Sequence, residues 1–77
     1  MQLNFATYAT AAAITPSDTV AQTYRAIYVG GAGNVSVVTA GGNTVTFTAP
    51  PVGTILPVEV QFVRATLTTA TLLIGLA

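Results

Sequence analysis

Three glycines within four residues, Gly30, Gly31 and Gly33, follow the strand-like run YRAIYV and could form a phosphate-binding turn. Such a turn needs a helix directly after the glycines, because the helix N-terminus supplies amide donors and the positive end of a dipole. The residues that follow are NVSVVT, which is β-branched and typical of a strand. No acidic residue lies about twenty positions later to hold a ribose, and there is no lysine for a Walker-type loop. These glycines are therefore expected to serve a chain reversal.

The chain has two carboxylates, Asp18 and Glu59, and such a pair could act as general acid and base in a glycoside hydrolase. Asp18 lies beside an expected turn and Glu59 within an expected strand, positions that favour a cap and an ion pair. A Ser-His-Asp triad needs a histidine as its base, and the sequence contains none. Histidine and cysteine are also absent as metal ligands. We therefore expect no enzyme activity and no cofactor.

Charged side chains occupy only 5% of the chain, and the net charge is zero. Soluble domains usually contain about 25% charged residues. In so uncharged a chain, ion pairs formed by Asp18, Arg25 and Glu59 would be partly buried, and would set register or partner choice more than stability. Arg64 is expected to face a partner instead. Two cations cannot neutralise the several phosphates that nucleic-acid binding requires, so nucleic acid is excluded as a partner.

The 77 residues suffice for one small domain, which buries only about 60% of the surface of its unfolded chain. Small scaffolds without disulfides or metals often rely on oligomerisation, and a net charge near zero promotes association. Threonine fills fourteen positions and, with alanine and glycine, takes the place of charged residues. We expect other protein to cover much of this surface. A threonine-rich monomer of modest solubility is the alternative.

The N-terminal run MQLNFATYATAAAIT has no basic residue, and polar residues interrupt its apolar stretch, so it does not fit a signal peptide. No run in the chain reaches the roughly 18 apolar residues of a membrane helix. The closing run TLLIGLA is too short to span a membrane. We expect the protein to be made and used in aqueous compartments, without export and without a membrane partner.

Residues 1–17 are expected to form an extended N-terminal arm, because proline at position 16 biases Thr15 toward extended backbone. Ser17 or Asp18 could cap a short helical turn after the arm. Residues 18–77 are expected to form a β domain, since runs rich in Val, Ile, Thr, Phe and Tyr alternate with Gly, Pro and Asn. The pattern predicts an all-β fold, a small antiparallel β-sandwich or barrel, with strands at 24–29, 35–39, 44–48, 58–63 and 70–76.

The run TAGGNT predicts a hairpin, because Gly41 and Gly42 can adopt the positive φ angles that primed two-residue turns require. Such a turn would place four residues on one face, namely Ser36, Val38, Val45 and Phe47. Neither face of this hairpin carries a charge, whereas a strand with one exposed face normally does. Both faces are therefore expected to make contacts. In VEVQFVRAT the alternation slips at Val63 and Arg64, which indicates a bulge or the end of the strand.

Aromatic side chains make up only 8% of the chain, which makes their positions informative. Phe5, Tyr8 and Ile14 are the only large anchors of the arm and are expected to contact another protein. Tyr24 and Tyr28 fall on one face of an expected strand, where they are core residues or interface anchors.

The order of motifs from Ile14 to the C-terminus resembles the head spike base family of tailed phages and gene transfer agents. The matching features are Asp18, Arg25 and the runs YVGGAGNV, AGGNTVTF, VGTILPV and TTAT. The resemblance implies a small β domain on the outer capsid surface of a virion, made in the host cytoplasm and docked on the major capsid protein. In gene transfer agents such proteins form a multimeric base that carries a host-binding fibre, and similar short chains serve as head decoration or cement proteins.

The resemblance and the residues point to the same function. We expect a structural virion protein that decorates or cements the capsid, either as a spike base or as plain cement. Its partners would be the major capsid protein, copies of itself in a trimer or pentamer, and a spike fibre protein. Two alternatives remain: a carbohydrate- or receptor-binding module that uses exposed tyrosine and asparagine side chains, and a small tail or baseplate subunit.

Overall fold

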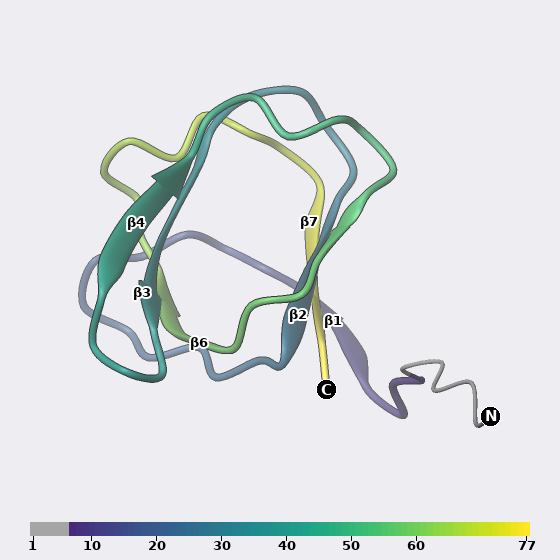
Figure 1. The fold of residues 1–77 in the computed structure, drawn as a ribbon, viewed down its shortest axis with the longest axis horizontal. Coiled ribbons are helices and arrows are strands. Elements are labelled where there is room, and N and C mark those ends of the chain that lie inside the picture. The colour runs from purple at the N-terminus through teal and green to yellow at the C-terminus, as the bar shows by residue number, and fades with distance from the viewer. Residues whose placement is uncertain (1–6) are drawn as a thin grey trace, which may run out of the picture.

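Seven short strands make up the β structure of residues 7–77, the part of the chain that the computed structural model describes (Figure 1). Their bounds are β1 Ala11–Ala13, β2 Ala26–Val29, β3 Val35–Thr39, β4 Thr44–Phe47, β5 Ile55–Leu56, β6 Val60–Val63 and β7 Leu73–Leu76. All strand pairs are antiparallel. The expectation of an all-β fold is confirmed.

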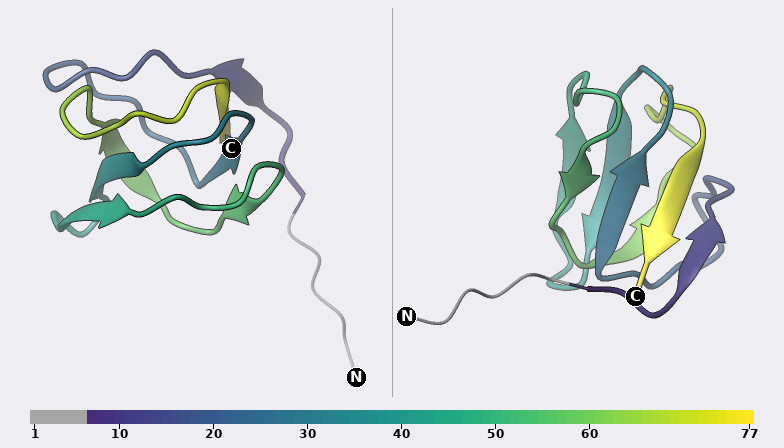
Figure 2. Two further views of the ribbon diagram at one scale, coloured as in Figure 1. Left: turned by 90° about the horizontal axis from the view of Figure 1, so that it is seen from above. Right: turned by 90° about the vertical axis from the view of Figure 1, so that its right-hand side faces the viewer.

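The strands form two sheets that face each other (Figures 1 and 2). Sheet A has the strand order β1-β7-β2-β5, and sheet B has the order β4-β3-β6. A bridge between Tyr24 and Val60 joins the two sheets along one side, with N···O distances of 3.3 and 2.9 Å. The fold is therefore a small antiparallel sandwich with its layers linked by backbone hydrogen bonds.

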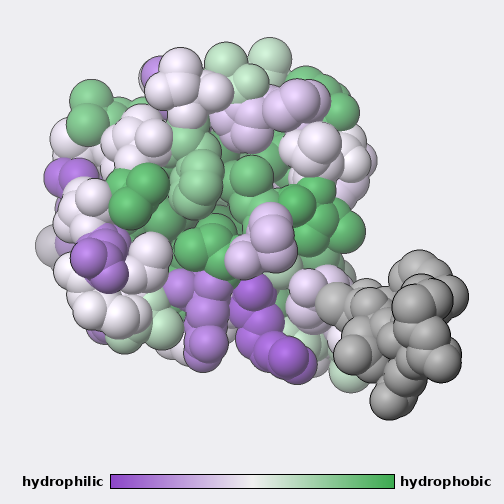
Figure 3. Space-filling model, in the orientation of Figure 1, coloured by the Kyte–Doolittle hydropathy of each residue, from purple (hydrophilic) through white to green (hydrophobic). Residues whose placement is uncertain are grey.

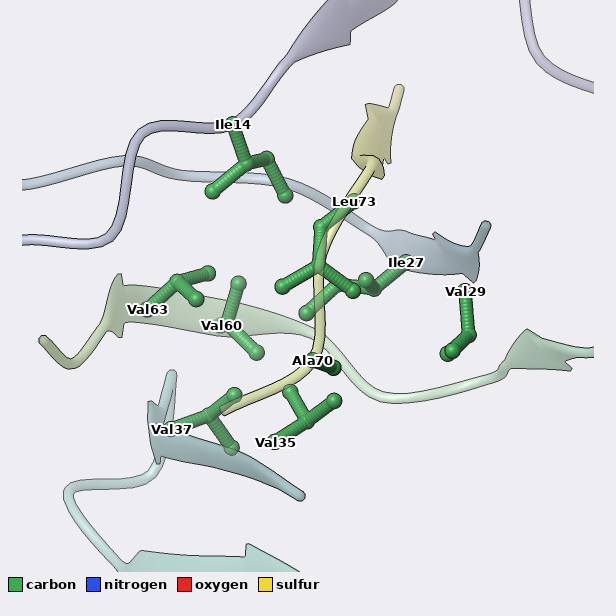
Figure 4. Packing of buried hydrophobic residues seen from close by; sticks show 9 residues of the cluster. All are labelled: Ile14, Ile27, Val29, Val35, Val37, Val60, Val63, Ala70 and Leu73. Carbon is green, nitrogen blue, oxygen red and sulfur yellow. The ribbon is translucent and has the colours of Figure 1, made fainter. Parts of the chain in front are cut away.

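The space between the two sheets is filled by aliphatic side chains, most of them β-branched (Figure 4). Sheet A contributes Ile27, Val29 and Leu73, and sheet B contributes the buried members Val35, Val37, Val60 and Val63. β-branched side chains pack well on a pleated surface, which explains why these runs form strands. The core therefore lies along the inner faces of the two sheets.

Strand positions predicted from the sequence agree with five of the seven strands, although each run but β3 is shorter than predicted. The two strands that the sequence did not predict are β1 and β5. Strand β1 consists of three alanines, which have low β propensity. Strand β5 has two residues and lies between Pro51 and Pro57 in the expected loop. Pairing with a neighbouring strand, rather than propensity, determines both.

The segment expected as an arm contributes directly to the domain. Ala11–Ala13 pairs with β7, and Ile14 enters the core with 8% of its surface exposed. The Ser17 hydroxyl accepts hydrogen bonds from the amides of Thr19 at 3.3 Å and Val20 at 3.1 Å. Ser17 therefore caps a bend rather than the helical turn that the sequence suggested.

The hairpin between β3 and β4 has a different register from the predicted one. Val37 pairs with Val45, and the Thr39 amide donates to the Asn43 carbonyl at 2.8 Å. The loop therefore has three residues, closed by Gly42 at φ +89°. The Asn43 amide donates to the Thr39 hydroxyl at 3.1 Å, which favours the longer loop. Because of this shift of one residue, the side chains of β3 lie on the opposite face from the one expected relative to β4. Val37 points into the core with Val35, and Ser36 lies opposite Thr46.

A bulge lies near the start of β6. Val38 pairs with Phe62, but Thr39 pairs with Val60, so Gln61 is the extra residue. The Gln61 side-chain amide donates to the carbonyls of Thr39 at 3.1 Å and Ala40 at 3.0 Å. The bulge allows Val60 and Val63 both to point into the core, which strict alternation forbids. The slip predicted at Val63 is the end of the strand.

Candidate interaction surface

The ion pair found in residues 7–77 joins Asp18 to Arg64, with Oδ1 and Nε 3.8 Å apart. Asp18 also accepts hydrogen bonds from the Thr66 amide at 3.1 Å and the Thr66 hydroxyl at 2.7 Å. The two bonds from Thr66, helped by the Arg64 charge, lower the pKa of Asp18. Arg64, predicted to contact a partner, lies beside Asp18 and helps to join the 64–66 loop to the segment that follows β1. Within the described residues, neither Arg25 nor Glu59 forms an ion pair.

The two carboxylates considered for acid–base chemistry lie at opposite ends of β6. Glu59 directly precedes the strand, and its carbonyl accepts the Ala40 amide at 2.9 Å. Asp18 contacts Arg64 and Thr66, which follow the strand. Residues 7–77 contain no group of three or more side chains suited to hold a metal ion. The arrangement is structural and assembles no catalytic pair.

The glycine run after β2 packs directly against the segment that leads into β7. A Cβ atom on Gly33 would lie 2.4 Å from the Ala70 nitrogen, and one on Gly30 would lie 2.4 Å from the Leu72 carbonyl oxygen. Gly33 also has a φ of +144°, which only glycine adopts readily. The next element is strand β3. The glycines allow two backbones to approach closely, and no phosphate-binding helix follows them.

Asn34 fastens this contact on both sides. Its carbonyl accepts the amides of Thr69 at 2.9 Å and Ala70 at 3.0 Å, and its own amide donates to the Thr69 hydroxyl at 2.8 Å. Its side-chain oxygen accepts the Ala49 amide at 2.9 Å. Three loops are thereby held together at one end of the sandwich. This role of Asn34 could not be predicted from the sequence, because its partners are distant in the chain.

Two leucines in the 64–72 segment are exposed and have left-handed backbones. Leu67 has φ +69° and is 61% exposed, while Leu72 has φ +54° and is 74% exposed. A left-handed conformation costs an L-residue about 1–2 kcal/mol. The domain thus holds two large apolar side chains in water, in an unfavourable backbone, without burying them in its own core. Contact with another protein is a common reason for a strained, exposed apolar side chain, and Leu72 is the one of the two that lies beside Gly30 at the end of β2.

The outer face of sheet A is apolar across all four strands. The pairing places Ala13, Ile74, Tyr28 and Ile55 in one row, and the next row contains Ala11, Leu76 and Ala26, of which Ala26 is fully buried. Tyr28 is 37% exposed and Ile55 48%. None of these seven residues is charged. In the right-hand view of Figure 2, no described segment lies in front of the sheet.

Leu72 extends this surface at its end. A Cβ atom on Gly30 would lie 2.8 Å from the Leu72 Cβ atom, and Gly30 is two positions after Tyr28. We define the outer apolar face as Ala13, Tyr28, Ile55, Leu72, Ile74 and Leu76. Figure 3 shows hydrophobic side chains reaching the side of the molecule on which sheet A lies, with hydrophilic residues along the lower edge. Uncharged apolar faces of this kind are typical of surfaces that associate with other proteins, so this face is the candidate interaction surface.

The residues predicted as interface anchors lie in different places. Tyr28 belongs to the outer apolar face. Tyr24 does not share that face, because its ring packs against the core and over Gly75, where an added Cβ would lie 2.5 Å from the ring. Tyr8 is half-buried and Ile14 is a core residue. Phe5 lies outside the described residues.

The sequence did not identify four residues of the outer face, namely Ile55, Leu72, Ile74 and Leu76. Apolar residues in a strand are equally consistent with a place in the core. Strand β5 lies in a run between prolines, where alternation could not be recognised. The sequence feature that could have indicated an exposed apolar face is the lack of charged residues in the strand runs.

No helix in the described residues has the length and apolar character needed to cross a membrane.

A scan against models of known protein families finds no match, and a search of curated proteins finds none either. Among solved structures, the chain is similar to one described as the capsid of a native gene transfer agent particle computed with C5 symmetry. The identity is 37%, the TM-score is 0.82, and the match covers 92% of this chain and 84% of that chain. By this likeness in sequence and fold, the protein belongs to the same family as that component of a gene transfer agent capsid.

Proposed function

We propose that the protein is a structural component of the outer capsid surface, which decorates or cements the shell as a homo-oligomer. The observation that carries the proposal is the match to a chain from a gene transfer agent capsid over 92% of the present chain. The same match favours a structural role over catalysis. The outer apolar face supplies the physical reason for docking on other protein.

Burial of this face would stabilise both the domain and the particle. Each Å² of apolar surface removed from water contributes about 25 cal/mol. Tyr28, Ile55 and Leu72 are each more than one-third exposed in the single chain. A domain this small gains proportionally more from covered surface than a larger one. Symmetric repetition on a shell would then multiply modest contacts through avidity.

The major capsid protein and copies of this chain are the proposed partners. Tyr28 is the predicted anchor that lies on the exposed sheet face, so we assign it to the capsid contact. Phe5 and Tyr8 precede β1 and are proposed to extend the contact as an arm. A trimer would fit cement at three-fold positions, and a pentamer would fit the base of a head spike that carries a fibre protein.

The first test is light scattering of the purified protein, followed by co-sedimentation with empty capsids of the cognate particle. We expect an oligomer that sediments with capsids. Tyr28→Asp and Ile55→Asp should abolish co-sedimentation, because each places a charge on the outer apolar face. Val20→Asp is the matched control: Val20 is 61% exposed and lies in the segment along β6, in the other sheet.

The outcomes separate the candidate functions. Loss of capsid binding in the face variants but not in Val20→Asp supports the proposal. A stable monomer that ignores capsids would overturn it, and a glycan array would then test the receptor-binding alternative. Binding to purified tails instead of capsids would point to a tail or baseplate subunit. Antibody labelling of intact particles reports whether the protein lies on the outer surface.

A further inference from the structure

The two sheets have four edge strands, which differ in how far they are covered or blocked from pairing with another strand. Strand β6 is covered along its outer edge, because Ser17 donates to Val63 at 2.8 Å and Gln22 to Gln61 at 2.7 Å. Strand β5 has two residues and is followed by Pro57. Short strands, prolines and covering segments are the devices by which proteins prevent edge-to-edge pairing. Two of the four edges are therefore protected.

Strand β1 is the edge of sheet A to which no other segment of residues 7–77 hydrogen-bonds. The Thr10 and Ala77 backbones exchange hydrogen bonds of 2.7 and 2.9 Å, and the Ile14 amide donates to Leu73 at 2.9 Å. Alternation along an antiparallel ladder then turns the amide and carbonyl groups of Ala11 and Ala13 away from β7. Strand β1 contains no charge, proline or bulge, and only methyl side chains flank its edge.

Strand β4 is the edge of sheet B that no further strand of the described part of the chain pairs with. The Thr39 amide donates to Asn43, and the register continues through Val37 and Val45. By the same alternation, the backbone groups of Thr44 and Thr46 point away from β3. The sequence of β4 is TVTF, again without a charge or a proline. Both open edges thus present two residues with outward donors and acceptors.

The two open edges lie on opposite sides of the molecule, β4 at the outside of sheet B and β1 at the outside of sheet A (Figures 1 and 2). We propose that β1 of one copy pairs with β4 of the next copy, so that copies join head to tail into a closed ring. Pairing of β1 with β1 across a two-fold axis would leave both β4 edges open. The head-to-tail contact covers both edges in every copy, and such heterologous contacts form rings when the rotation closes.

This inference rests on the proposed homo-oligomer and names its contact. The occupant of each edge is a second copy of this chain, because that copy always carries the complementary edge. The flanking side chains of β1 are methyl groups, which leave room for the threonines of β4. Main-chain hydrogen bonds would give the affinity, as in other strand additions.

Engineered disulfides test the contact, because the chain has no cysteine of its own. The double variant Ala13→Cys with Thr46→Cys carries one cysteine on each open edge. Disulfides form only where two Cα atoms lie within about 7 Å. We expect oxidation to give a closed, covalently linked ring on non-reducing gels. A second double variant, Ala11→Cys with Thr46→Cys, allows for the other register.

Matched controls fix the interpretation of these gels. Either single variant should remain uncross-linked, because the same strand of two copies does not meet in a head-to-tail ring. Ala13→Cys combined with Val20→Cys moves the second cysteine to an exposed residue away from β4 and should give no ring. Dimers in the Ala13→Cys single variant would show β1–β1 pairing and would overturn the inference.

A proline variant tests the hydrogen bonds independently. Ala11→Pro removes an outward amide and leaves the bonds between β1 and β7 in place, so it should weaken self-association by about fivefold. Ala11→Val keeps the amide and should associate as the unchanged chain does. Circular dichroism checks that both variants fold. If Ala11→Pro does not fold, amide exchange of Thr44 and Thr46 provides the second measurement, with slower exchange expected in the oligomer.

Failure of the inference can be told from failure of the proposed function. An oligomer that binds capsids but forms no ring disulfide in either register overturns the edge contact alone. Cross-linked rings that do not bind capsids support the edge contact and overturn capsid docking. A stable monomer that does not bind capsids, with amide exchange at β4 equal in the presence and absence of capsids, overturns both.

Discussion

The Thr66 hydroxyl donates a 2.7 Å hydrogen bond to Asp18 Oδ2 across 48 positions of the sequence. The Thr66 amide donates to the other carboxylate oxygen, and Arg64 lies beside it. This contact connects the segment after β1 to the loop that follows β6. It also makes the stability of that connection depend on the charge of a single carboxylate.

Acid should weaken this connection. The bonds from Thr66 lower the pKa of Asp18 below its ordinary 3.8, so the folded chain binds fewer protons than the unfolded chain. The stabilisation is therefore complete above the ordinary pKa and is lost as pH falls through the lowered value. We expect Asp18→Asn to remove this part of the acid dependence in urea unfolding below about pH 4. Unchanged acid dependence in Asp18→Asn would contradict the assignment.

The glycines after β2 should be sensitive to substitution in proportion to the space around them. Gly33→Ala meets the Ala70 backbone and forces a φ of +144°, so it should lower the free energy of unfolding by about 3 kcal/mol. Gly41→Ala meets its first neighbouring atom at 3.5 Å and should change stability by less than about 0.5 kcal/mol. Urea unfolding measures both. Equal effects would mean that close packing is not the reason for the glycine.

Gly53 separates backbone strain from packing. Its φ is +89°, and no atom lies within 4 Å of an added Cβ. Gly53→Ala should therefore lower the free energy of unfolding by about 1 kcal/mol, from backbone strain alone. A larger loss in Gly33→Ala than in Gly53→Ala would report the Ala70 contact together with the different backbone strain at φ +144°.

Leu72 should stabilise the particle while it destabilises the single chain. Asparagine tolerates the left-handed backbone better than leucine, so Leu72→Asn should raise the free energy of unfolding by about 0.5–1 kcal/mol. The same change should weaken capsid binding. Leu67→Asn is the control, because residue 67 has the same backbone strain but lies between residues bonded to Asp18 and Ser36. It should gain stability without losing binding.

Capsid binding should depend little on salt. The outer apolar face has no charged side chain, and exposed charge pairs are the contacts that salt screens. We expect the Kd for capsids to change by less than about threefold between 0.1 and 0.5 M NaCl. A steep fall in affinity would mean that the few charged residues, rather than Tyr28 and its neighbours, carry the contact.

The sequence predicted what depends on neighbouring residues. Alternation and β-branched residues located five of the strands, and the absence of histidine and cysteine argued against catalysis. Pairing between distant segments was not predictable in the same way. The alanines of β1 become a strand only because β7 lies beside them.

Single contacts also determine the length of the hairpin loop and the direction of Tyr24, which could not be predicted from the periodicity of the sequence. The hydroxyl of Thr39 accepts the Asn43 amide and so lengthens the hairpin loop by one residue. Tyr24 and Tyr28 are four positions apart, yet Tyr24 turns inward because its backbone bridges to Val60 before β2 begins. The close contact of Gly33 with Ala70 has no sequence signal beyond the glycine itself.

The pairing of β1 with β7 also bears on the speed and order of folding. Strand β1 has β7 as its one partner in sheet A, and the pair Ala11–Leu76 brings together nearly the whole described length of the chain. Such a large loop must close before its contacts can stabilise the chain, and β-sandwiches accordingly fold in about milliseconds to seconds. We therefore expect strand β1 to be among the last elements to dock. Its open edge would then exist only on a folded subunit, so a chain that has not finished folding would be unable to join an assembly through it.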